Sequence, residues 1–201
     1  DWEDVDAVIG CMDTSAAAEV IGNLDASAAV EVVAHLDYDC IASILEKMEH
    51  PVALSILTNM HASEDATESL LQMTAQSAAN ILTSGDSYGD AALLLSKMEY
   101  PNAAKMVSLM DSSDAAYLLS ELEYDQSAEI LSKIKVALAA AVVAEMEYYD
   151  AGGVLSKMDL SKAVALLRAG DVDAEAIFEE MEDKKMLEQL RSRVAKRQKG
   201  A

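Results

Sequence analysis

A twelve-residue unit repeats along almost the whole chain and limits its fold more than any other feature. The unit that begins at Met12 reads Met-Asp-x-x-x-Ala-Ala-x-Val-Ile-x-x. Its first residue, here called the anchor, is usually apolar and recurs at intervals of 11 to 13 residues. Such self-similarity indicates a repeat architecture. The anchors are Met12, Leu24, Leu36, Met48, Met60, Met73, Gly85, Met98, Met110, Leu122, Ile134, Met146, Met158, Gly170 and Met181.

The spacing within the unit predicts short helices. A small residue follows each anchor after about five positions, and an aliphatic pair follows after about eight or nine. These positions and the next anchor lie on one helical face, because they follow the i, i+3/i+4, i+7 pattern. We therefore predict an all-α fold. It is a right-handed superhelix of about 14 short helices with a roughly 12-residue repeat, plus a longer C-terminal helix.

An acidic residue follows most anchors, at the position where a helix cap belongs. A carboxylate there accepts backbone hydrogen bonds and favours the positive end of the helix dipole. Pro51 and Pro101, the only prolines, fall in the first turn, where proline is tolerated. Carboxylates at successive helix starts are also oxygen ligands of the kind that Mg²⁺ or Ca²⁺ prefers, so loose binding of divalent cations stays open beside the capping role.

Charge divides the chain into two parts. The net charge is −21, yet residues 183–201 hold seven of the fifteen basic residues. We predict a repeat solenoid over residues 1–182 and a basic C-terminal helix or tail over residues 183–201, with one longer helix starting near Asp173. The acidic body repels nucleic acid, and no apolar run is long enough for a transmembrane segment. The tail is either a capping helix with a solvated end or an arm that docks on an acidic partner or a membrane surface. The candidate contact residues in it are Lys184, Lys185, Arg191, Arg193, Lys196 and Arg197.

Residues for catalysis are not evident in the sequence. It contains no nucleophile elbow, phosphate loop or dinucleotide fingerprint, and the three histidines never pair with a cysteine at ligand spacing. We expect no enzymatic activity, no cofactor and no specific metal site. Cys11 and Cys40 are expected to be buried, reduced thiols, because nothing resembles a disulfide framework.

Four tyrosines form the clearest departure from the repeat. Each lies two places after an anchor, in a chain whose aromatic content is only 4%. They either pack over a neighbouring helix or form part of an interaction surface, since tyrosine is enriched at interface hot spots. These candidate interaction residues are Tyr38, Tyr100, Tyr124 and Tyr148.

The unit Leu-Asp-x-x-x-Ala-x-x-Val-Val-x-x, as at Leu24, resembles the helical repeats of the MgtE amino-terminal superhelical domain. The related domain of the flagellar motor switch protein is similar in style. In the transporters this domain is cytosolic, acidic and responsive to magnesium, and it works beside CBS domains and a membrane pore. This chain contains neither a CBS-like segment nor a membrane span. The resemblance therefore implies the superhelical fold and carries over no ion ligand.

These observations favour a non-catalytic scaffold or linker that binds other proteins through its superhelical surface. The chain begins with Asp1 rather than Met, which fits a precursor cleaved on import into an organelle. We therefore expect the protein to be a subunit of a larger complex in the chloroplast, peripheral to the thylakoid membrane. Its expected partners are membrane-complex or antenna subunits. A cytoplasmic location is the alternative. The alternative function is an acidic regulatory domain that senses Mg²⁺ or another divalent cation.

Overall fold

The computed structural model describes residues 2–60, 63–85, 88–170 and 172–195. Within these ranges the chain forms sixteen helices and no strand, which confirms the all-α repeat fold. Contacts divide the chain into two compact units, Asp1–Met98 and Glu99–Ala201. The boundary predicted at 182/183 and the right-handed sense of the superhelix stay predictions.

The helices are short in both units. The first unit holds α1 (Trp2–Cys11), α2 (Thr14–Gly22), α3 (Ala26–Val33), α4 (Tyr38–Leu45), α5 (His50–Asn59), α6 (Ser63–Gln72), α7 (Ala75–Leu82) and α8 (Tyr88–Ser96). The second holds α9 (Tyr100–Val107), α10 (Ser112–Ser120), α11 (Tyr124–Leu131), α12 (Val136–Glu145), α13 (Tyr148–Lys157), α14 (Leu160–Ala169), α15 (Ala174–Glu180) and α16 (Lys184–Ala195).

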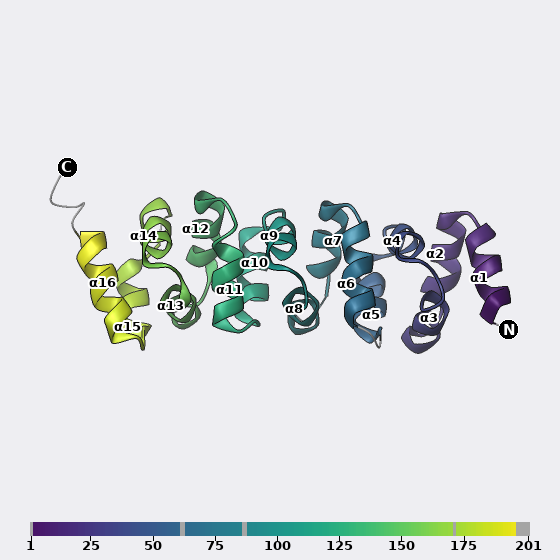
Figure 1. Ribbon diagram of the computed structural model, residues 1–201, viewed down its shortest axis with the longest axis horizontal. Coiled ribbons are helices and arrows are strands. Elements are labelled where there is room, and N and C mark those ends of the chain that lie inside the picture. The colour runs from purple at the N-terminus through teal and green to yellow at the C-terminus, as the bar shows by residue number, and fades with distance from the viewer. Residues whose placement is uncertain (1, 61–62, 86–87, 171, 196–201) are drawn as a thin grey trace. The chain divides into compact units, whose positions relative to one another are not determined.

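Within each unit, most helices pack mainly on the helix two places along the chain. In the second unit α11 contacts α9 and α13, and α12 contacts α10 and α14 (Figure 1). In the first unit α4 contacts α2 and α6, and α5 contacts α3 and α7. The odd-numbered and even-numbered helices therefore form two rows within each unit. The structural period is two repeats, and in the second unit the pair Glu-Tyr recurs with that period at residues 99–100, 123–124 and 147–148.

The core consists of the residues that the repeat assigned to the helix face. The small residue of most repeats, such as Ala53 or Ala139, is buried, and so is the second residue of most aliphatic pairs. Most anchors are also buried, as Met181 is at 1% exposure. Val20 and Leu24 are exceptions at 49% and 40% exposure. They lie near the N-terminal end of the first unit, where fewer helices are available to cover them.

The helix caps separate aspartate from glutamate. Aspartates at the N-cap accept hydrogen bonds from backbone amides of the first turn, whereas the glutamates at the equivalent position make no capping hydrogen bond. The capping aspartates are Asp13, Asp25, Asp37, Asp111, Asp159, Asp173 and Asp183. The glutamates without a capping bond are Glu49, Glu99, Glu123 and Glu147. The shorter aspartate places its oxygen within reach of these amides. The prediction that the acidic residues cap their helices is thus correct for aspartate only.

The C-terminal region corrects the prediction of one long helix from Asp173. Two helices form instead, α15 and α16, because Met181 adopts an extended conformation and Asp183 caps α16 through the amide of Met186 at 2.9 Å. The sequence Met-Glu-Asp repeats the signal of an anchor followed by an acid, so the chain turns there as it does in other units. At 12 residues α16 is the longest described helix, and Met186, Leu187 and Leu190 are buried on its inner side.

The prediction of two buried cysteines was wrong for Cys11 and only partly met by Cys40. Cys11 is exposed and Cys40 is partly buried. Cys11 immediately precedes an anchor, and the residues equivalent to it, such as His35 and Lys47, are exposed as well. Among the described residues, no helix is long and apolar enough to cross a membrane.

The capping rule can be tested at two adjacent helices of one unit. Asp159 accepts from the amides of Ser161 and Lys162, so Asp159→Ala should lower the free energy of unfolding by about 1 kcal/mol. Glu147→Ala is the matched control and should change it by less than about 0.5 kcal/mol, because no capping bond is lost. Urea unfolding followed by circular dichroism gives both values. Equal losses in the two variants would contradict the rule.

Candidate protein-contact site

The four predicted tyrosines occupy one structural position. Tyr38, Tyr100, Tyr124 and Tyr148 are each the first residue of a helix, namely α4, α9, α11 and α13. From this position a side chain can reach the helix two places along, which packs beside its own helix. Tyr38 and Tyr124 make hydrogen bonds of this kind, whereas Tyr148 is 47% exposed.

Tyr124 is held by α13 through a hydrogen bond and a ring contact. Its hydroxyl donates to Asp150 Oδ1 at 3.1 Å. The ring of Tyr149 meets it edge to face, with centroids 6.4 Å apart and an interplanar angle of 69°. Partial burial, together with the neighbouring Asp150 carboxylate, raises the pKa of Tyr124 to about 12. Both effects disfavour the negatively charged tyrosinate.

Gly153 provides the surface on which Tyr124 lies. A Cβ at Gly153 would come within 2.6 Å of Cδ2 and Cζ of the Tyr124 ring, closer than real Cβ contacts allow. At Gly152 a Cβ would meet Cγ of Met181 at 3.1 Å, so this residue lets α13 and α15 approach. The two glycines thus have different roles: Gly153 makes room for the ring of Tyr124, and Gly152 makes room for Met181.

A pocket of about 510 Å³ opens beside this tyrosine pair. Aromatic side chains, a lysine and three carboxylates surround it, so it combines apolar ring faces with an acidic rim. We call it the tyrosine pocket; its residues are Tyr124, Tyr149, Gly153, Ser156, Lys157, Glu180, Glu182 and Asp183.

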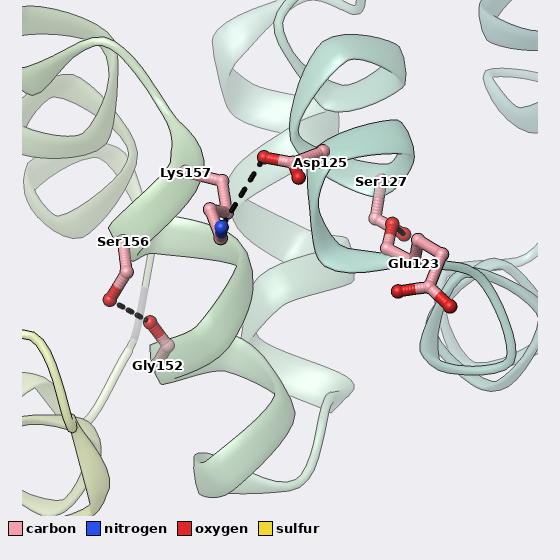
Figure 2. Close-up of polar contacts among 6 residues, drawn as sticks. All are labelled: Glu123, Asp125, Ser127, Gly152, Ser156 and Lys157. Atoms are coloured by element: carbon pink, nitrogen blue, oxygen red, sulfur yellow. Dashed lines mark hydrogen bonds and ion pairs between the residues drawn. The ribbon is translucent and has the colours of Figure 1, made fainter.

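The polar groups near this pocket are partly paired within the chain. Figure 2 shows Lys157 of α13 directed towards Asp125 of α11, with Nζ 3.6 Å from Oδ1. Ser156 donates to the carbonyl oxygen of Gly152 at 2.7 Å. Ser127, fully buried in α11, donates to the carbonyl oxygen of Leu119 at 2.7 Å and so joins α11 to the end of α10. The serine at this small-residue position therefore has its hydrogen bond satisfied.

The first unit repeats the tyrosine arrangement on a smaller scale. Tyr38 of α4 donates to Asp65 Oδ1 of α6 at 2.7 Å. This hydrogen bond, with the charge of Asp65, raises the pKa of Tyr38. A pocket of about 350 Å³ lies beside the pair and includes the apolar residues Val30, Ile41 and Met60. Asp65 and Asp150 both occupy the third position of their helices.

The predicted basic residues lie on α16 and are partly used within the fold. Arg191 pairs with Glu175 at 3.3 Å, and its guanidinium lies 5.5 Å from the ring centre of Phe178. Lys184 donates to the carbonyl oxygen of Met181 at 3.2 Å. Lys185 and Arg193 have exposed side chains. The predicted residues Lys196 and Arg197 lie outside the described residues.

Sequence reasoning missed several residues of the tyrosine pocket, including Tyr149 and Glu180. It also missed Asp150, the hydrogen-bond partner of Tyr124. The useful signal is an aspartate at the third helical position two repeats after a tyrosine, as at Asp65 and Asp150. Within the described ranges no three histidine, cysteine or acidic side chains gather in a group that could hold a metal ion. The tyrosine pocket offers a partner two tyrosine rings and a rim of charged groups.

The hydrogen bond of Tyr124 predicts a dependence of stability on pH. The folded state raises this pKa from 10.0 to about 12, so the stabilisation is complete below pH 10.0 and is lost as the pH rises towards 12. Tyr124→Phe should be about 1 kcal/mol less stable than the wild type at neutral pH, and this difference should shrink across that interval. Unfolding at a series of pH values, with Tyr148→Phe as control, measures it. A difference that stays constant would contradict the assignment.

The repeat and its geometry agree with one known family. The model of the MgtE intracellular N domain matches three overlapping stretches, residues 12–87, 60–148 and 86–182. Together they extend over most of the chain and confirm the resemblance seen in the repeat. No curated protein and no solved structure matches the chain. The matched stretches include every helix from α2 to α15, and the chain belongs to the MgtE intracellular N domain family.

Proposed function

We propose that this protein is a non-catalytic scaffold that binds other proteins through the surfaces of its helical repeat. The observation that carries the proposal is the tyrosine pocket. Two tyrosine rings in edge-to-face contact line this pocket together with Glu180 and Glu182. The pocket is large enough for a side chain of a partner.

The chemistry of the tyrosine pocket favours a basic side chain. An arginine or lysine of the partner would lie against the tyrosine faces and pair with the carboxylates of the rim. Lys157 carries the like charge, but its ammonium lies near Asp125. Tyr124 is already positioned by Asp150 and Gly153, so little side-chain entropy would be lost when a partner binds.

The basic face of α16 supplies a second contact. Lys185 and Arg193 project from a helix whose inner side is buried on the repeat, so an acidic partner or an anionic membrane surface would meet them there. Membership of a larger organellar assembly, with antenna or membrane-complex subunits as partners, stays a prediction beside this proposal.

A native pull-down from cell extract tests the scaffold function. We expect the wild-type chain to recover defined protein partners, and Tyr149→Ala to reduce recovery at least about fivefold, corresponding to about 1 kcal/mol. Tyr117→Ala is the matched control, because Tyr117 and Tyr149 are 59% and 52% exposed.

The double variant Lys185→Glu, Arg193→Glu tests the contact at α16. It is preferable to deleting residues 183–201, since deletion would remove the buried Leu190. Failure of the wild type to recover any partner would refute the proposal.

A second candidate is regulation by Mg²⁺ or another divalent cation. The family match favours it, because the MgtE intracellular N domain is a helical domain of magnesium transporters. The chain carries a net charge of −21 and places carboxylates at most helix starts, so cations would relieve repulsion between successive helices.

Small-angle scattering distinguishes this candidate from the scaffold function. A sensor should become more compact with Mg²⁺ than with a monovalent salt at the same ionic strength, because divalent ions bridge carboxylates. Asp39→Asn and Asp114→Asn, which remove charge without removing a capping aspartate, should reduce the effect. Identical scattering in the two salts would exclude the sensor and leave the scaffold proposal unaffected.

A further inference from the structure

Helix α12 is apolar on its solvent side as well as on its buried side. Val136 and Leu138 are 45% and 43% exposed, and the other exposed residues of this helix are Ala137, Ala141, Ala144 and Glu145. A helix that is apolar all round is normally buried. In a chain of net charge −21, such a face indicates a surface that another molecule covers.

The start of α12 breaks a second local rule. Its N-cap is Lys135, which makes no capping hydrogen bond, whereas the other N-caps that the structure defines are aspartate, glutamate or threonine. A cation at the positive end of a helix dipole is unfavourable. Local rules that are broken without a gain inside the fold are typical of functional surfaces.

The two ends of α12 carry opposite charges. The exposed Lys133 and Lys135 precede the helix, and the exposed Glu145 and Glu147 lie at its end. Glu145 accepts one hydrogen bond from Ser113 of α10 at 3.3 Å. The four charges balance, so α12 and its ends add no net negative charge at the place where two copies of the chain would meet.

We propose that the solvent face of α12 is the contact of a symmetric homodimer. Two copies of α12 lie antiparallel across a two-fold axis, so that the lysine end of one meets the glutamate end of the other. Ala137, Ala141 and Ala144 follow the i, i+4, i+7 spacing and let the backbones approach, while Leu138 fills the centre. The antiparallel helix dipoles also attract each other.

One helix face is smaller than a standard protein interface of about 1,600 Å². The dimer is therefore weak and forms between micromolar and millimolar protein. This inference rests on α12 alone and does not depend on the tyrosine pocket, so it stands or falls separately from the proposed scaffold function.

Sedimentation equilibrium of the full chain at about 0.15 M salt tests the proposal. The wild type should change from monomer to dimer over this concentration range. Leu138→Glu should weaken dimerisation at least about tenfold, because two carboxylates meet near the axis. The matched control is Leu93→Glu on α8, which adds the same charge at a residue that is 55% exposed and should leave dimerisation unchanged. Circular dichroism of each variant confirms folding.

A charge exchange then tests the antiparallel arrangement. Lys135→Glu and Glu145→Lys alone should each weaken the dimer, since like charges meet, and the double variant should restore it. A binding partner other than a second copy would not produce this rescue. A wild type that is monomeric at every concentration overturns the proposal in favour of a different occupant. A dimer that Leu138→Glu leaves intact, an equal loss in Leu93→Glu, or a double variant without rescue also overturns it.

Discussion

The structure depends on packing between helices that are too short to persist alone. Most of them have eight to ten residues, below the length at which an isolated helix is stable in water. Their stability comes from the alanine and aliphatic face that each one buries on the helix two places along. The fully buried alanines keep the backbones of neighbouring helices close. A larger residue at Ala53 or Ala139 would therefore push its helix away from the helices on which it packs.

Much of the fold follows from the sequence, because the repeat states the same local signals many times. Most anchors, small residues and aliphatic pairs have the predicted burial, and Pro51 and Pro101 lie in first turns. The two-row packing was not predicted, since periodicity defines a buried face and does not say which helix covers it. The break between α15 and α16 was also missed. Leu187, Leu190 and Val194 continue the apolar pattern of the preceding residues, but the cap at Asp183 starts a new helix.

The candidate site was predicted in part for the same reason. The tyrosine positions were evident from their constant offset, and the structure places them at the start of helices. Their partners Asp65, Asp150 and Tyr149 depend on which helix lies alongside, so the offset alone could not identify them. Asp159 caps its helix and Glu147 does not, because the glutamate side chain is longer by one methylene group. The prediction considered only the negative charge, which the two residues share.

Packing between alternate helices has a consequence for how such a chain can change in length. Gain or loss of a single repeat would transfer every later helix of the same unit to the opposite row. A change between Tyr124 and Asp150 would separate the tyrosine from the row that contains its partner. Gain or loss of two repeats would keep each helix in its row. The inherited unit of this architecture is therefore a pair of helices, and length variants that function should differ by an even number of repeats.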